Sequence, residues 1–80
     1  MNQSPNLSKQ MTFAAALNLL LTGNRVRRLS WEDARVYLAI FDEKLMIFKP
    51  EDNRLHPLIV NIGDITGTDW VVCRQEIKNG

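Results

Sequence analysis

The sequence predicts an α+β fold, with one N-terminal helix packed on an antiparallel sheet of about five short strands. Two observations lead to this prediction. Between residues 12 and 23, apolar residues recur at the spacing of one helix face, and after residue 24 their period shortens toward two. The expected connections between strands are short, which favours antiparallel pairing with the helix on one face of the sheet.

The helical segment is bounded by residues suited to its two ends. Thr12 can cap the first turn, and Gly23 can end the helix in the left-handed conformation. The opposite face of this helix is small and mildly polar, so it could lie against a neighbouring subunit. The apolar face is formed by Phe13, Ala16, Leu17, Leu20 and Leu21.

Five short segments that are rich in branched and aromatic residues, or that alternate in polarity, are predicted as strands. Residues 42–44 are expected to form a hairpin connection, and residues 50–54 are expected to form a polar loop. Pro57 is tolerated at the beginning of a strand, and Asp64 is placed to cap one short helical turn over residues 64–68. The strands are expected over residues 25–29, 36–41, 45–49, 58–62 and 70–73.

The length of the chain allows one domain, which we expect over residues 11–75. An 80-residue chain buries only about 60% of its unfolded surface, which leaves no apolar material for a second core. Residues 1–10 are polar and aperiodic and are expected to form a flexible arm, and residues 76–80 are expected to form a polar tail. A core of this size seldom contributes more than ~3 to 5 kcal/mol, so self-association is the expected source of further stability.

The composition excludes several classes of protein. The 10 basic and 9 acidic residues give a net charge of +1, which argues against a general nucleic-acid binder. No apolar run approaches the ~20 residues that span a bilayer, and no signal peptide begins the chain, so we expect no membrane association and a cytoplasmic protein. The basic residues do gather locally, and an anionic ligand would be attracted there first. This concentration contains Arg25, Arg27, Arg28 and Arg35.

The sequence offers few candidates for catalysis, and an enzyme is not expected. His56 is expected in a polar loop beside a proline, and Cys73 lies near the end of an apolar strand, where a free cysteine usually packs as a small apolar residue. The four glycines do not cluster into a phosphate-binding loop. One cysteine and one histidine cannot build a structural zinc site. We therefore expect no catalytic residues, no metal and no cofactor.

Two tryptophans carry the first candidate binding function. Trp31 follows the basic segment, and Trp70 follows Asp69. Each can be an anchor in the core or in a subunit interface, because large aromatic residues contribute much of the stability of a small core. Each can also stack on a nucleobase while neighbouring guanidinium groups bind phosphate. The two interpretations are compatible at a pocket formed between subunits.

Two arginines of the first strand are further candidates. Strand alternation places Arg28 on the face of Val26, where a charged side chain must be paired or must line a cavity. Asp69 is a candidate partner for Arg28, and the alternative is that Arg28 extends to solvent from the strand end. Arg27 belongs to the opposite face, from which it could reach a ligand across an oligomer interface.

These residues together resemble a known phage family, the one that contains the second type of Thoeris anti-defence protein. The resemblance covers about residues 11 to 73. It is carried by Thr12 and Phe13, the leucine-rich helix and Gly23, and by the segments RVRRLSW (residues 25–31) and DITGTDW (residues 64–70). The positions that match the family pattern best are Arg28, Trp31, Asp69 and Trp70.

The resemblance implies a function for the chain. Proteins of this kind are non-enzymatic sponges, homo-oligomeric and tetrameric, that bind cyclic ADP-ribose-like signals in the cytoplasm of the infected host. Binding without degradation keeps the bacterial defence effector inactive. Some relatives are associated with inhibition of CRISPR nucleases or with capture of cyclic dinucleotides. A protein-binding inhibitor and a cyclic-dinucleotide sponge are therefore the alternatives to a cyclic ADP-ribose sponge.

Overall fold

The computed structural model describes residues 9–73 and confirms the α+β fold. Five strands form one antiparallel sheet in the order β4-β3-β2-β1-β5. Residues 1–8 of the expected arm and the whole tail expected at residues 76–80 lie outside the described residues. In chain order the elements are α1 (Phe13–Leu21), β1 (Arg25–Arg28), β2 (Tyr37–Phe41), β3 (Lys44–Lys49), β4 (Arg54–Pro57), α2 (Ile62–Thr66) and β5 (Trp70–Cys73).

The two ends of α1 form as the sequence predicts. The Thr12 hydroxyl accepts a hydrogen bond from the Ala15 N–H at 3.2 Å, which satisfies one of the free amides of the first turn. Gly23 follows the helix with a φ of 96°, in the left-handed region that favours glycine. One expected apolar position is wrong, because Leu21 at the end of the helix is 67% exposed.

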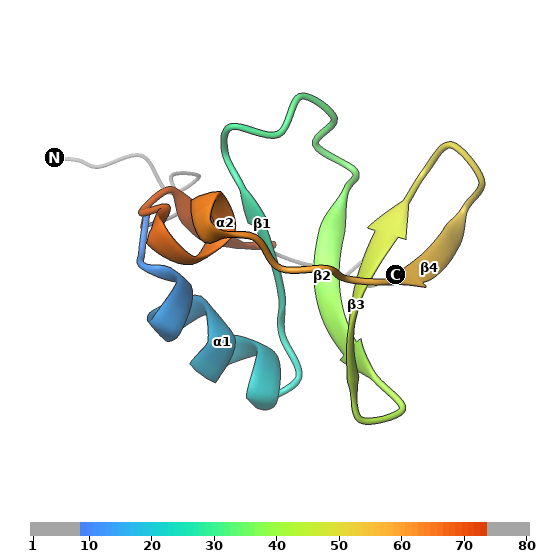
Figure 1. Cartoon of the computed structure of the whole chain (residues 1–80), viewed down its shortest axis with the longest axis horizontal. Helices are drawn as coiled ribbons and strands as arrows, with labels where there is room; N and C mark the ends of the chain where they lie inside the picture. The colour runs from blue at the N-terminus through green and yellow to red at the C-terminus, as the bar shows by residue number, and fades with distance from the viewer. Residues whose placement is uncertain (1–8, 74–80) are drawn as a thin grey trace, which may run out of the picture.

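The last strand does not extend the sheet beyond β4 but pairs with β1 at the opposite edge. After β4 the chain therefore crosses the sheet, and α2 lies on this crossing segment (Figure 1). Both helices cover the same face, since α1 contacts β1, β2, β5 and α2. We call this side the covered face.

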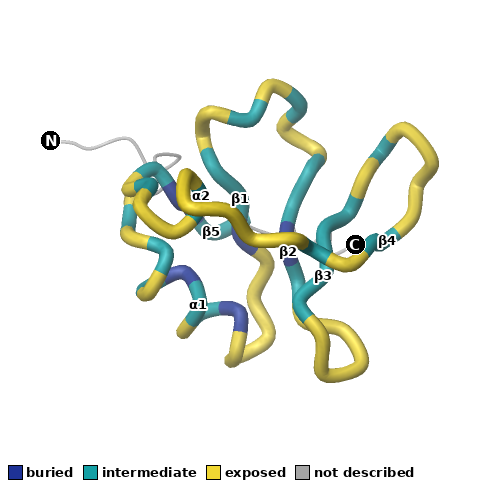
Figure 2. Tube along the Cα trace, viewed as in Figure 1, coloured by how far each residue is buried: buried dark blue, intermediate teal, exposed yellow. Residues whose placement is uncertain are grey.

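The core lies between α1 and the covered face. Its fully buried residues come from α1, β1, β2 and β5, whereas the crossing segment is largely exposed (Figure 2). In the described part of the chain, no helix is long and apolar enough to cross a membrane. The buried cluster consists of Ala16, Leu20, Val26, Leu38 and Trp70.

The hairpin between β2 and β3 is one residue tighter than predicted. Phe41 pairs with Lys44, so only Asp42 and Glu43 form the turn. Both have positive φ, 56° and 62°, as a two-residue hairpin turn with the twist of the strands requires. Lys44 therefore begins β3 instead of belonging to the connection.

The fourth strand lies at residues 54–57, and its prediction at residues 58–62 is wrong. The tight turn after β3 pairs Lys49 with Arg54, which brings a polar segment into the ladder. Pro57 then ends the strand instead of beginning it. The aliphatic run after it is not a strand, because only Leu58 packs against the core and Ile59 is 85% exposed.

The short second helix also begins earlier than predicted. Asn61 is the N-cap, not Asp64, because the Asn61 side chain accepts a hydrogen bond from the Asp64 N–H at 2.9 Å. The Asp64 carboxylate in turn accepts from the Asn61 N–H at 3.2 Å. This reciprocal capping box places Asp64 in the first turn of α2.

Candidate functional site

Four of the five predicted site residues gather at one corner of the covered face. Arg28 at the end of β1 pairs in register with Trp70 at the beginning of β5, and Asp69 lies immediately before Trp70. The Arg28 Nε donates a hydrogen bond to the Asp69 Oδ1 at 2.8 Å, and about a fifth of each side chain is exposed. The predicted ion pair is therefore present, and Arg28 does not extend freely to solvent.

Asp69 also holds the loop that carries Trp31. Its second carboxylate oxygen accepts a hydrogen bond from the Ser30 N–H at 2.9 Å. Burial acts to raise the pKa of the Asp69 carboxyl, but the hydrogen bonds from Arg28 and Ser30 outweigh burial and hold this pKa below its usual value. The Asp69 carboxylate thus joins β1, β5 and the beginning of the loop after β1.

The other side of the Arg28 guanidinium lies against α2. Nη1 donates to the Gly63 carbonyl at 3.3 Å and lies 3.7 Å from the Asp64 carboxylate. Gly67 makes this approach possible, because a Cβ at that position would lie 2.6 Å from Arg28 Nη2. Its φ of −66° is open to any residue, so Gly67 is required for space and not for backbone conformation.

The two tryptophans have different environments. Trp70 is completely buried, its Nε1 donates to the Asp64 carbonyl at 3.0 Å, and its ring packs on Phe13 at 5.2 Å. Trp31 is half-buried and meets Trp70 edge-on, with 5.6 Å between the ring centroids. Within the chain, Trp70 is therefore a core residue, and Trp31 is the tryptophan that retains surface for a ligand.

A hollow of about 540 Å³ opens beside Trp31, between the loop after β1, strand β3 and the crossing segment. Its lining combines apolar side chains with acceptors. Among the predicted site residues, only Trp31 lines it, and the described lining contains no basic side chain. The lining residues are Ser30, Trp31, Glu32, Asp33, Val36, Ile47, Leu58, Ile59, Asn61 and Asp64.

Arg27 is separated from the other predicted site residues. Strand alternation sends its side chain to the opposite face of the sheet, as the sequence predicts. Its Nη2 donates to the Trp31 carbonyl at 3.1 Å, and its buried Nε has no hydrogen-bond partner among the described residues. Arg27 therefore holds the Trp31 backbone by a hydrogen bond from the opposite face of the sheet, and it does not line the hollow within one chain.

The sequence interpretation missed two residues of the hollow, Asn61 and Asp64. The sequence places Asn61 in a strand, because the aliphatic residues before it resemble one, and it places Asp64 at the N-cap of the short helix instead of in its first turn. The available signal was the spacing of Asn61 and Asp64, a capping residue followed three positions later by an acidic residue. That signal would have placed both side chains at the beginning of a helix beside Arg28.

The groups that could support catalysis lie elsewhere. His56 on β4 contacts Asp52, with 2.9 Å between the His56 Nε2 and the Asp52 carboxylate. Burial raises the pKa of the Cys73 thiol, while Arg27 and Arg25 act to lower it. Neither His56 nor Cys73 lines the hollow. Over residues 9–73, no three histidine, cysteine or acidic side chains gather in a way that could hold a metal ion.

Comparison with known proteins identifies a family. The family model of the Thoeris anti-defense 2-like domain, Tad2-like, matches residues 11–73, which is most of the chain and includes every residue of the site described above. No curated protein matches the chain. The chain therefore belongs to the Thoeris anti-defense 2-like family, and this membership supports a role in countering Thoeris defence.

Proposed function

We propose that this protein is a non-enzymatic sponge that binds a cyclic ADP-ribose-like immune signal and so keeps the defence effector inactive. Family membership supports the anti-defence part of this proposal. The observation that carries the ligand part is the hollow beside Trp31, whose volume of about 540 Å³ suits a small molecule. We place this activity in the cytoplasm of the infected host, where such a signal would be made.

The lining of the hollow fits the nucleoside part of such a ligand. The half-buried indole of Trp31 offers an aromatic surface for adenine, and a stacking contact of this kind contributes ~1 to 3 kcal/mol. The Asn61 amide and the Asp64 carboxylate can accept hydrogen bonds from ribose hydroxyls or an amino group. The bonds of Arg28 and Asp69 hold this corner in place before a ligand arrives, which lowers the entropic cost of binding.

The phosphates of the ligand need a cation that this lining does not supply. Three carboxylates line the hollow: Glu32, Asp33, which pairs with Arg35, and Asp64, which lies 3.7 Å from Arg28. These two arginines are thus already paired with carboxylates and are not part of the lining. A neighbouring copy of the chain can supply the missing basic groups. We therefore propose that the working form is a homo-oligomer, a tetramer as the family resemblance implies, in which Arg27 of one copy can reach the ligand of another.

An exposed aliphatic surface beside the hollow supports self-association. Four branched residues between 59 and 65 are exposed, and exposed apolar surface of this kind usually marks an interaction site. The exposed fractions are 85% for Ile59, 37% for Val60, 71% for Ile62 and 50% for Ile65. We expect Ile59→Glu to shift the protein toward the monomer in light scattering coupled to size exclusion. An unchanged mass would place the self-association surface elsewhere.

Titration calorimetry with cyclic ADP-ribose isomers and cyclic dinucleotides tests the ligand proposal. We expect a cyclic ADP-ribose isomer to bind, and Trp31→Ala to weaken this binding about tenfold or more through lost stacking. Tyr37→Ala is the matched control, since this aromatic residue lies on the other side of the sheet, and it should leave affinity unchanged. Ligand recovered from the denatured complex should be chemically unchanged.

Other outcomes of the same experiment would contradict the proposal in distinct ways. Binding heat with cyclic dinucleotides alone would support a sponge but would show that its ligand is not a cyclic ADP-ribose isomer. Recovery of a modified ligand would show an enzyme. No heat with any nucleotide at high protein concentration would refute the sponge and favour the alternative, a protein-binding inhibitor.

A further inference from the structure

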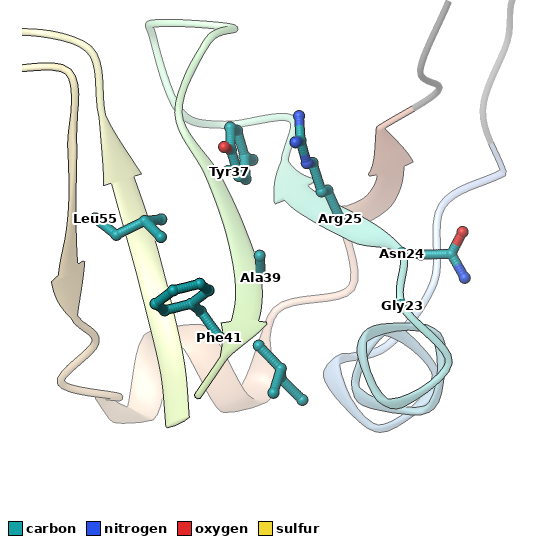
Figure 3. Close-up of a pocket in the computed structure, with 8 residues that line it drawn as sticks. Gly23, Asn24, Arg25, Tyr37, Ala39, Phe41 and Leu55 are labelled. Atoms are coloured by element: carbon teal, nitrogen blue, oxygen red, sulfur yellow. The ribbon is translucent and has the colours of Figure 1, made fainter. Parts of the chain in front are cut away.

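The face of the sheet that turns away from the helices forms a second surface, of which the proposed function uses only Arg27. Arg25 and Tyr37 point away from α1 and α2 on this side (Figure 3). Strand alternation and the pairing register place Ala39, Phe41, Phe48 and Leu55 on the same side of the sheet. We call this side the open face, and its central residues are Arg25, Tyr37, Ala39, Phe41, Phe48 and Leu55.

The charge of the open face has one sign. The five strands contain no acidic residue, and alternation places three of their basic residues, Arg25, Arg27 and Lys44, on this face. Within residues 9–73, no carboxylate lies at ion-pair distance from any of these three cations. The open face is thus locally cationic in a chain whose net charge is only +1, and it complements an acidic partner.

Two of the three aromatic side chains of the open face, Tyr37 and Phe48, are already stacked on their neighbours. The Arg25 guanidinium lies 4.5 Å from the centroid of the Tyr37 ring. Phe48 stacks on Tyr37 with 5.0 Å between centroids and 10° between the planes. Because β1 and β3 flank β2, Arg25 and Phe48 cover opposite sides of the Tyr37 ring. Tyr37 therefore has no free ring face on which a nucleobase could stack.

A hollow of about 260 Å³ lies on the open face, over the small side chain of Ala39 (Figure 3). Arg25 and Tyr37 border this hollow toward β1. Phe41 at the end of β2 and Leu55 on β4 also line it, and Phe41 is 60% exposed. This volume is below the ~300 to 1,000 Å³ of small-molecule sites. It can accept one apolar side chain, and the guanidinium at its border can pair with a carboxylate next to that side chain.

We propose that the open face docks an acidic segment of a protein partner. One apolar or aromatic side chain of that segment enters the hollow over Ala39, and a neighbouring carboxylate pairs with Arg25. Further carboxylates along the segment face Lys44. Charge complementarity argues for the acidic character of the partner, and the covered ring of Tyr37 together with the small hollow argues for a polypeptide over a nucleotide.

A defined peptide tests this proposal on the full chain. The probe is a blocked pentapeptide in which two glutamates flank one phenylalanine on each side. Its binding is measured from the amide chemical shifts of the ¹⁵N-labelled protein. We expect shift changes that centre on Ala39, Phe41 and Leu55, and binding that weakens as salt is raised. A peptide with lysines in place of the glutamates should produce no such changes.

Two variants of the open face and one control locate the contact. Arg25→Glu should weaken binding about tenfold by replacing an attraction with a repulsion, and Ala39→Leu should block the hollow. Arg54→Glu makes the same change of charge at an exposed residue whose pairing with Lys49 puts it on the covered side, and it should retain binding. Unchanged dispersion of the amide spectrum would show that each variant is folded.

Each contrary result would overturn the proposal. Equal weakening by Arg25→Glu and Arg54→Glu would show nonspecific charge attraction. Stronger binding of adenosine monophosphate to the same residues would assign the face to nucleotides. Concentration-dependent shifts of these amides without peptide would show that a second copy covers the open face.

Discussion

The two faces of the sheet use the same residue type for opposite purposes. On the covered face, Arg28 is bonded to Asp69 and Gly63 and contacts Asp64, so its charge is neutralised within the chain. On the open face, Arg25 lies over the Tyr37 ring and has no carboxylate partner among the described residues. The Arg28 guanidinium is four-fifths buried and its carboxylate partners offset the cost of that burial, whereas Arg25 is exposed and is hydrated by solvent. The four-residue strand β1 thus carries at one end an arginine that stabilises the fold, Arg28, and at the other end an arginine that can bind a partner, Arg25.

The largest expected effect contrasts the aromatic residues of the two faces. Trp70→Ala removes a completely buried ring and should cost about 3 to 5 kcal/mol of unfolding free energy, enough to unfold much of a small domain. Phe48→Ala on the open face removes a half-buried ring and should cost less than half as much. Urea unfolding followed by circular dichroism measures both, and equal costs would contradict the assignment of the core to the covered face.

The next effect contrasts the two arginine environments. Asp69→Ala leaves the Arg28 guanidinium and the Ser30 N–H without their shared acceptor, and we expect a loss of about 2 kcal/mol. Arg25→Ala removes only an exposed contact with Tyr37 and should change stability by no more than about 0.5 kcal/mol. If the two variants unfold at the same urea concentration, the hydrogen bonds of Asp69 do not contribute to the stability of the fold.

The contribution of Asp69 should also depend on pH. Its folded-state pKa is lowered by Arg28 and Ser30, so between the folded and unfolded pKa values the unfolded state binds more protons. The stability difference between the native protein and Asp69→Asn should therefore be complete above about pH 5 and shrink as pH falls below the unfolded value of about 3.9. Unfolding curves at a series of pH values test this. A difference that grows on acidification would contradict it.

The smallest effect concerns the space beside Arg28. Gly67→Ala places a Cβ 2.6 Å from Arg28 Nη2, so the guanidinium must shift, and we expect a cost of about 1 kcal/mol. Thr68→Ala is the control, because Thr68 lies beside Gly67, is exposed, and has no side-chain hydrogen bond within residues 9–73. The Arg28 Nε–H resonance should move in the first variant and stay in the second. Movement in both would show that Arg28 is not held by the turn at Gly67.

Local sequence determined the elements whose signals are short-range. The capping of α1 by Thr12, the left-handed Gly23 and the alternation of β1 follow from neighbouring residues, and all three are as predicted. Alternation also led to the pairing of Arg28 with Asp69, because a charge on the face of Val26 needs a partner. The prediction failed between residues 54 and 66, where a polar segment forms β4 and an aliphatic segment does not form a strand.

The sequence by itself thus determined the fold class, the ends of α1 and the Arg28 and Asp69 pair, since periodicity and side-chain charge are properties of short segments. Only the tertiary structure decided that Trp70 is buried while Trp31 borders a hollow, that Asn61 and Asp64 join that hollow, and that Arg27 lies behind it. These outcomes depend on β5 pairing with β1 across 41 residues of sequence, as the separation of Arg28 and Asp69 shows. No local pattern encodes that pairing, because it is selected by the packing of the whole core.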